Sequence, residues 1–304
     1  MIYTVTLNPA LDLVIRGDKL NLGTINRMQE LGLVAGGKGV NVSVMLAECG
    51  VESTALGFCA GSPGDEIKRQ LTEKGVKSDF TELESGFSRI NIKIEAEEET
   101  EINCFGPNIS DEKLKEFFGV IDSIPEGSIL VLAGNVPPCL PQNIYELIMI
   151  RCKGRNIRFV VDAAGERLRS LLRLKPYLIK PNNFELEELF DTKAETMDDL
   201  IILGNKCRDM GAENVIISLG AKGSIFLTER EDPIFTPAAD GEVINTVGAG
   251  DSMLAGFLAG KERGYDNKKC MMLATACGGA TSFSVGIAEK DLIDKVFHSL
   301  CGNI

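Results

Sequence analysis

The residues best suited to chemistry are a glycine-rich turn and one carboxylate, in N-T-V-G-A-G-D-S at 245–252. Gly248 and Gly250 let the main chain point N–H groups at an anion, and a helix that follows adds the positive end of its dipole. Asp251 would repel a phosphate, so its place in such a turn favours a base that takes the proton of an attacking alcohol during phosphoryl transfer. An ordinary first-turn Asp is the alternative interpretation.

A second glycine-rich turn, G-G-K-G-V-N at 36–41, also precedes a helical run. It suits a ligand that approaches the backbone closely, and Lys38 would neutralise a phosphate as a point charge. A solvated surface lysine is the alternative for Lys38 alone. The chain has no G-x-x-x-x-G-K-[ST] and no full G-x-G-x-x-G, which disfavours a P-loop NTPase and a dinucleotide-binding dehydrogenase.

Three further residues could bind a sugar phosphate. Asp12 follows the first predicted strand, where a carboxylate could accept hydrogen bonds from sugar hydroxyls. Arg89 begins a strand of alternating polar and apolar residues, and Arg27 lies in the segment 11–35. Either arginine could close over an anion with bidentate geometry. Taken singly, an arginine in such a position is more often a surface residue.

Polar residues also end the later predicted strands. K-P-N-N-F-E at 180–185 places Asn182 and Glu185 either in a capping box or in a clamp on Mg²⁺ and its waters. The loop that begins with Ser218 and Gly220 fits a nucleotide-facing turn or a plain β-turn. Asp162 ends another strand and is compatible with a role behind the ligand-contacting residues.

Composition excludes several classes of protein. The net charge of -12 argues against a general binder of nucleic acid or anionic membranes. Nine scattered cysteines without a C-x-x-C pair are typical of reduced thiols, not of a disulfide framework or zinc site.

The start of the chain lacks a basic leader, and a cytoplasmic enzyme is the expectation. The lone His298 lies near the C-terminus without a nucleophile motif, which argues against a catalytic triad.

The elements that must position these residues alternate between strands and helices. Short β-branched runs, separated by amphipathic stretches, predict a doubly wound, mainly parallel sheet sandwiched by helices. The predicted strands are 3–7, 53–58, 129–133, 157–162, 177–180 and 215–219. Ligands of such sheets collect at the carboxyl ends of the strands, where the polar residues fall.

Two regions interrupt this alternation, approximately 11–35 and 87–106. The strict period of two in R-I-N-I-K-I-E at 89–95 indicates a strand with one wet face. We interpret both regions as a small β-sheet lid inserted in one domain that spans residues 1–304. The glutamates between 95 and 101 are expected to form a solvated hairpin tip.

The motifs of this chain and their order resemble those of the PfkB (ribokinase-like) family of sugar kinases. In order, they are T-L-N-P-A-L-D, G-G-K-G-V-N, R-I-N, K-P-N-x-x-E and N-T-V-G-A-G-D-S. The resemblance spans nearly the whole chain. It implies a ribokinase-like α/β fold and ATP-dependent phosphorylation of a ketohexose phosphate at a primary hydroxyl, with Mg²⁺ as cofactor. Fructose 1-phosphate is the expected substrate, tagatose 6-phosphate is the near alternative, and a non-catalytic sugar-phosphate sensor is the alternative of another class.

The resemblance also assigns residues. Asp251 would be the base, and the amides of Gly248, Ala249 and Gly250 would form the anion hole. The sugar phosphate would be held by Asp12, Gly37, Lys38, Asn41 and Arg89, with Arg27 as a weaker candidate. ATP would be bound by Lys180, Asn182, Glu185, Ser218, Gly220 and Ser284, with Glu185 organising Mg²⁺ through water. A homodimer through the lid is implied by analogy.

Two positions depart from the family pattern. Cys104 stands where glycine is frequent after E-T-E-I-N, and Ala164 replaces the usual serine of D-x-S-G. Neither touches the expected base. Cys104 leaves the identity of the sugar more open than the type of reaction.

Overall fold

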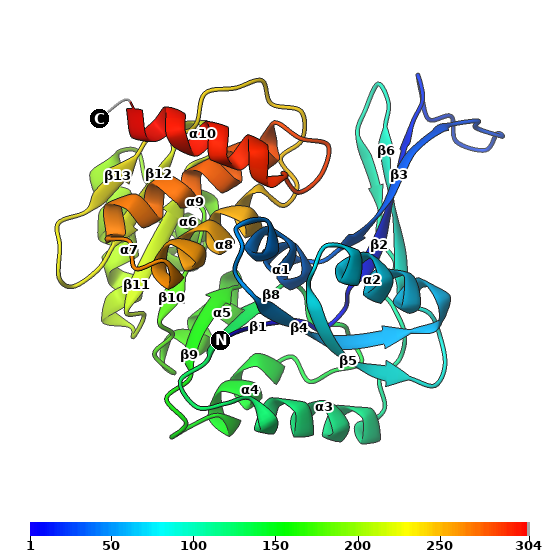
Figure 1. The fold of residues 1–304 in the computed structure, drawn as a ribbon, viewed down its shortest axis with the longest axis horizontal. Coiled ribbons are helices and arrows are strands. Elements are labelled where there is room, and N and C mark those ends of the chain that lie inside the picture. Colours follow the sequence, from blue (N-terminus) through cyan, green and yellow to red (C-terminus); the bar gives the residue numbers. More distant parts are fainter. Residues whose placement is uncertain (303–304) are drawn as a thin grey trace.

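Nine strands form the central sheet of the protein (Figure 1). They are β1 (Ile2–Thr6), β4 (Ser53–Ala60), β5 (Lys77–Leu83), β8 (Ile129–Ala133), β9 (Arg158–Asp162), β10 (Leu178–Ile179), β11 (Asn214–Ser218), β12 (Ser224–Leu227) and β13 (Ile234–Thr236). In this computed structural model, which describes residues 1–302, their order is β13-β12-β11-β10-β9-β8-β1-β4-β5. All neighbours from β5 to β11 are parallel, and β12 and β13 are antiparallel additions. The predicted mainly parallel sheet is confirmed.

The central strands are apolar on both faces because helices cover both. In β8, Leu130 and Leu132 pack in one buried cluster while Ile129 and Val131 pack in the other. A strand buried on two sides needs a continuous apolar run, which is what residues 129–133 supply. The sheet therefore forms the rigid centre from which the strand-end residues project.

Ten α-helices lie among residues 1–302. They are α1 (Lys38–Glu48), α2 (Gly61–Glu73), α3 (Asp111–Ser123), α4 (Ile144–Arg151), α5 (Gly165–Leu172), α6 (Asn183–Phe190), α7 (Met197–Asp209), α8 (Ala249–Glu262), α9 (Asn267–Ser282) and α10 (Lys290–Gly302). Helices α3 to α7 pack against one face of the sheet, and α1 with α8 to α10 pack against the other. Figure 1 shows these two layers.

A second sheet projects from this body (Figure 1). It consists of β2 (Ala10–Arg16), β3 (Gln29–Gly36), β6 (Arg89–Glu95) and β7 (Thr100–Ile102), in the order β3-β2-β6-β7. The predicted second small sheet is thus confirmed, and the strand expected at 89–95 has those bounds.

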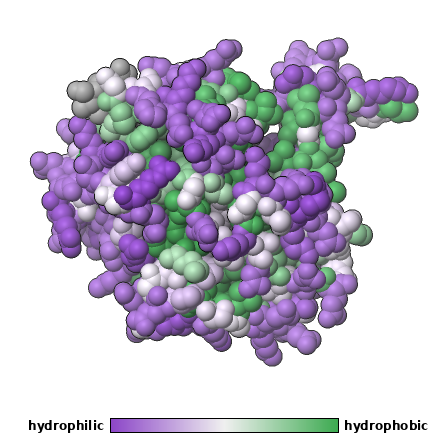
Figure 2. Space-filling model, in the orientation of Figure 1, coloured by the Kyte–Doolittle hydropathy of each residue, from purple (hydrophilic) through white to green (hydrophobic). Residues whose placement is uncertain are grey.

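Strand alternation gives the small sheet two unlike faces. Leu13 pairs with both Leu33 and Ile92, and Ile92 pairs with Ile102, which places these four apolar side chains in one row. Asp12, opposite Asn91, belongs to the other face. Figure 2 shows hydrophobic surface on the small sheet. Leu33, Ile90 and Ile102 are among its exposed apolar residues.

The helices of the described residues are too short or too polar to cross a lipid bilayer.

Candidate active site

One cleft between the two sheets collects most of the predicted site residues. Its lining includes Asp12, Gly37, Lys38, Asn41, Arg89, Lys180, Gly248, Gly250 and Asp251. The central sheet contributes the residues at its strand ends, and the small sheet contributes Asp12 and Arg89. Residues separated by more than 200 positions in sequence therefore line the same cavity.

The N-terminus of α8 forms one wall of the cleft. Gly248 caps this helix with φ 80°, a left-handed conformation that favours glycine. Among residues 1–302, no acceptor is hydrogen bonded to the N–H of Gly248, Gly250 or Asp251, so these amides are free for an anion. The amide of Ala249, expected in the same anion hole, already donates to the carbonyl of Thr246 at 3.2 Å.

Asp251 lies in the first turn of α8 and is only 5% exposed. Its Oδ2 accepts a hydrogen bond from Asn41 Nδ2 at 2.8 Å, which fixes the carboxyl group. Burial, and secondly the nearby carboxylate of Asp162, raises the pKa of Asp251 to about 7, although the Asn41 hydrogen bond opposes the rise. A carboxyl group with a pKa near neutrality can both accept and release a proton.

Two lysines share the buried carboxylate of Asp162. Lys38 Nζ donates to Asp162 Oδ1 at 3.2 Å, and Lys180 Nζ lies 3.8 Å from Oδ2. Burial opposes ionisation of Asp162, but the charges of Lys180 and Lys38 outweigh it and hold the pKa of Asp162 below its ordinary value. Burial likewise works against the Lys38 ammonium, yet the pKa of Lys38 is raised because the Asp162 and Asp251 carboxylates prevail.

Lys180 reaches the turn that begins α8. A Cβ atom placed on Gly250 would lie 3.0 Å from Lys180 Nζ. The ammonium group therefore stands directly beside the free amides of the turn. A side chain at position 250 would crowd the Lys180 ammonium group.

The small sheet presents the carboxylate of Asp12 and the guanidinium group of Arg89 to the cleft. Asn91 Nδ2 donates to Asp12 Oδ1 at 2.8 Å, and the Cys104 amide donates to Asn91 Oδ1 at 3.3 Å. Arg89 Nε donates to the carbonyl of Asn8 at 3.0 Å, and burial lowers the pKa of Arg89. The exposed Cys104 thus contributes its backbone amide to the orientation of Asp12.

Four of the predicted ATP-binding residues follow or end strands β10 and β11, close in sequence to the cleft-lining Lys180: Asn182, Glu185, Ser218 and Gly220. The Asn182 side chain accepts from the Glu185 amide and the Glu185 carboxylate accepts from the Asn182 amide, both at 2.8 Å. This capping box is the alternative interpretation of the motif. Ser218 pairs with Asn182 as a β-bridge, and Gly220 begins a short 3₁₀ turn, Gly220–Lys222.

Two predicted residues stand apart from this arrangement. Arg27 is exposed on the long loop between β2 and β3 and does not line the cleft, because the loop extends beyond the end of the small sheet (Figure 1). Ser284 follows α9, and its hydroxyl donates to the carbonyl of Ala280 at 3.0 Å. The exposed His298 lies on α10 and is likewise absent from the cleft lining.

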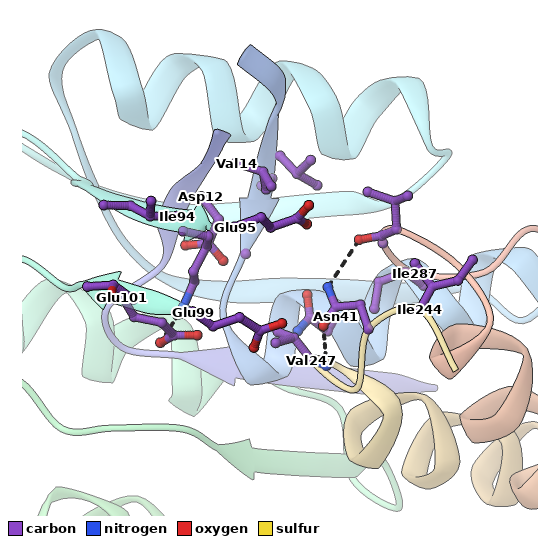
Figure 3. Close-up of a pocket in the computed structure, with 18 residues that line it drawn as sticks. Asp12, Val14, Asn41, Ile94, Glu95, Glu99, Glu101, Ile244, Val247 and Ile287 are labelled. Atoms are coloured by element: carbon purple, nitrogen blue, oxygen red, sulfur yellow. Dashed lines mark hydrogen bonds and ion pairs between the residues drawn. The ribbon is translucent and has the colours of Figure 1, made fainter. Parts of the chain in front are cut away.

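A second pocket adjoins the cleft and shares four lining residues with it: Asp12, Asn41, Lys93 and Val247 (Figure 3). The hairpin formed by β6 and β7 lines this pocket with Glu95, Glu99 and Glu101. Four of the five glutamates that were expected to be solvated are exposed (Glu97, Glu98, Glu99 and Glu101), and Glu95 is half-buried. Lys93 Nζ pairs with Glu101 Oε2 at 2.6 Å.

Sequence reasoning missed some residues of the cleft. Asn91 and Lys93 also line it, and their period of two with Arg89 was a signal that all three share a face. Asp162 was placed at a strand end, but its contacts with Lys38 and Lys180 join three separate elements that no local pattern connects. Asn103 and Asn135 carry no such signal.

The arrangement can transfer an anionic group to an alcohol. It combines a buried carboxyl group, free amides at a helix N-terminus and two ammonium groups in one cleft. Developing negative charge would meet the amides and lysines, and the proton of the alcohol would meet the carboxylate.

Comparisons with known proteins agree with this chemistry. The model of the pfkB family carbohydrate kinases matches residues 6–292. A 1-phosphofructokinase of Bacillus subtilis (strain 168) is 40% identical over 296 residues, with 97% of each chain covered. A D-tagatose-1-phosphate kinase of Bacillus licheniformis is 37% identical over the same length and coverage. The crystal structure of Escherichia coli phosphofructokinase-2 in complex with substrates and products superposes with a TM-score of 0.90 at 26% identity, covering 99% of both chains.

Proposed function

The chain belongs to the pfkB family of carbohydrate kinases, and from this premise we propose that it transfers the γ-phosphoryl group of ATP to the 6-hydroxyl of fructose 1-phosphate. The product is fructose 1,6-bisphosphate. The observation that carries the proposal is the buried Asp251 at the N-terminus of α8, in a cleft that also holds Lys38, Lys180 and Arg89.

Asp251 is the proposed general base. Its carboxylate accepts the proton of the 6-hydroxyl as the oxygen attacks phosphorus, and Asn41 holds it in place during this step. The hydrogen bond matters because a base must lie within reach of the proton that it removes. A pKa of about 7 lets the group accept this proton near neutral pH.

The turn before α8 is the proposed anion hole. The free amides of Gly248 and Gly250 face the migrating phosphoryl group, and the positive end of the helix dipole adds to them. Lys38 and Lys180 supply full positive charges on the two sides of Asp162. We assign the amide of Ala249 a lesser part, since Thr246 already accepts its hydrogen bond.

The small sheet is the proposed sugar-binding lid. Asp12, oriented by Asn91, accepts hydrogen bonds from ring hydroxyls, and Arg89 binds the phosphate that the sugar already carries. Closing this sheet over the substrate would exclude water and suppress hydrolysis of ATP.

The residues of the site fit a Mg²⁺ ion that is bound mainly by the phosphates of ATP. No group of three or more His, Cys, Asp or Glu residues suited to a metal is found in the part of the chain that the structure describes. Mg²⁺ typically keeps several waters and binds one or two carboxylates together with substrate phosphates. Glu185 would hold its waters, and the bound ion would neutralise charge on the phosphates. Asn182, Ser218, Gly220 and Ser284 are proposed to face the nucleotide.

D-Tagatose 1-phosphate is a second candidate substrate, because one relative is named for it. It differs from fructose 1-phosphate in the configuration of one ring hydroxyl and offers the same 6-hydroxyl to Asp251. Both relatives are named for position 1 of the sugar, which favours a ketose 1-phosphate over tagatose 6-phosphate.

A homodimer through the small sheet is also proposed. The apolar row of Leu13, Leu33, Ile92 and Ile102 lies on the face opposite to that of Asp12. Leu33 is 38% and Ile102 is 49% exposed in the single chain. A second copy would remove this apolar surface from water.

A coupled assay of ADP release with Mg·ATP tests the proposal. We expect turnover with fructose 1-phosphate to exceed that with D-tagatose 1-phosphate, tagatose 6-phosphate, fructose 6-phosphate and free fructose, and Asp251→Asn to abolish most of it. Preference for a tagatose phosphate would change the substrate and keep the mechanism. Binding of a sugar phosphate without turnover of any would instead identify a sensor.

A further inference from the structure

Asp162 is a buried carboxylate that aims into the cleft with incomplete hydrogen bonding. Its side chain is 2% exposed. Oδ1 accepts from Lys38 Nζ, whereas Oδ2 is buried with no hydrogen-bond partner among the described residues and faces Lys180 Nζ at 3.8 Å. A buried carboxylate oxygen without a partner costs free energy, so its retention needs a functional or electrostatic reason.

The charged groups around Asp162 come from several elements. Lys38 begins α1, Lys180 follows β10 and Asp251 lies on α8. Tyr145 of α4, which is buried, lies near enough to Arg167 of α5 and to Asp162 that both charges affect the pKa of its hydroxyl group. Glu185 of α6 acts on Lys38. The ammonium groups of Lys38 and Lys180 thus lie close to the carboxyl groups of Asp162 and Asp251.

Asp162 is the member of this cluster that joins the two lysines. The end of β9 lies between β8 and β10 in the middle of the sheet, which makes Asp162 a fixed point. Lys38 is otherwise a long side chain, 44% exposed, at the start of a helix. Without the carboxylate, each ammonium group would be free to sample other rotamers, and the two would repel each other.

We propose that Asp162 is a positioning residue for phosphoryl transfer, which holds the Lys38 and Lys180 ammonium groups at the N-terminus of α8 and sets the charge that Asp251 experiences. This inference rests on the proposed kinase function and extends it to a residue that acts through the two lysines and Asp251. When the phosphates of ATP arrive, the lysines can bind them from positions already fixed, which reduces the ordering cost of the reaction.

Replacing Asp162 with Asn has two expected effects. The lysines lose their anionic partner, so kcat/KM falls by about 10²-fold and KM for ATP rises. The Asp251 carboxylate loses a like charge and keeps both positive charges nearby, so the pKa of Asp251 falls. The acid limb of the pH profile of kcat/KM should move to lower pH by at least about half a unit.

The test compares wild type, Asp162→Asn, Lys38→Met and the double variant over pH 5 to 9. We expect the acid limb to move in Asp162→Asn, and we expect the Asp162 change to cost much less activity when Lys38 is already replaced. Asp122→Asn is the charge-matched control, because Asp122 pairs with Arg151 at 2.5 Å on the surface between α3 and α4. The control should keep the wild-type profile.

Carbon-13 NMR of labelled aspartate side chains gives a readout that needs no sugar. The Asp251 signal, identified by its loss in Asp251→Asn, should titrate at lower pH in Asp162→Asn than in wild type. An unmoved titration and acid limb would overturn the inference, even if thermal unfolding showed that Asp162→Asn is less stable. If wild type turned over none of the sugars, the kinase proposal would fail while the NMR titration still decided the effect of Asp162.

Discussion

At the residue scale, Asp251 is both the proposed base and a buried carboxyl group. Its activity as a base requires the ionised form, so kcat/KM should rise with pH up to about 7 and then level off. Asp251→Asn should lower kcat by about 10² to 10⁴ and remove this acid limb. A pH profile of the two proteins checks both points. An acid limb near pH 4, the ordinary range of a carboxyl group, would contradict the assignment.

The same carboxyl group should cost the protein stability at alkaline pH. Because the pKa of Asp251 is higher in the folded chain than in the unfolded chain, its contribution favours folding below about pH 4 and is lost as pH rises through about 7. Asp251→Asn should therefore unfold at a higher temperature than wild type at pH 8. Thermal unfolding at pH 8 measures this, and a lower midpoint for the variant would refute the argument.

Arg89 is the residue of the small sheet that is proposed to bind the phosphate of the sugar. Losing a charge-assisted hydrogen bond of roughly 1.5 to 3 kcal/mol should raise KM for the sugar phosphate about 10- to 100-fold in Arg89→Gln, with little change in KM for ATP. Arg16→Gln is a suitable control, since Arg16 lies in the adjacent strand β2 and pairs with Glu95. Equal effects on both substrates would remove Arg89 from the sugar site.

At the element scale, the sequence predicted strands best where one physical requirement dominated. Residues 129–133 are apolar throughout because both faces are buried, and residues 89–95 alternate because one face is wet. Strands β12 and β13 were not predicted. They are short antiparallel additions at the edge of the sheet, whose pairing depends on β11 more than on their own pattern.

The site was predictable where a motif stays on one element. The turn before α8 carries its own signal in the glycines and Asp251. The bond between Asn41 and Asp251 joins residues 210 positions apart, and Asp162 meets its lysines only after three elements have packed. Spacing also could not separate a capping box at Asn182 and Glu185 from a clamp on Mg²⁺ and its waters, because both use the same two side chains.

Helix α5 offers a stability test of the departure at Ala164. Ala164 occupies the N-cap with extended backbone angles, φ -123° and ψ 167°, but has no side-chain oxygen to accept from the first turn. Ala164→Ser should increase the free energy of unfolding by about 1 kcal/mol. Urea unfolding measures the change. Ala164→Val, which cannot cap, should give no such gain, and equal values for the two variants would exclude the capping explanation.

At the scale of the whole molecule, the apolar outer face of the small sheet should decide the oligomeric state. Leu33→Asp places a charge in the row formed with Leu13, Ile92 and Ile102, which should weaken the proposed dimer. Sedimentation velocity would show a shift towards monomer. Ile150→Asp is the matched control, because Ile150 is 55% exposed on α4. A wild-type protein that sediments as a monomer at micromolar concentration would contradict the dimer.

The division of the cleft between two sheets has an evolutionary consequence. Asp251, Lys180 and Asp162 belong to the buried central body, whereas Asp12, Asn91 and Arg89 belong to a projecting sheet with much less core. If the proposed roles hold, substitutions in the projecting sheet should reshape sugar preference while the chemical step stays intact. New substrate ranges would be reached by mutations in β2, β6 and β7, and selection for a different sugar should enrich changes there before it touches α8.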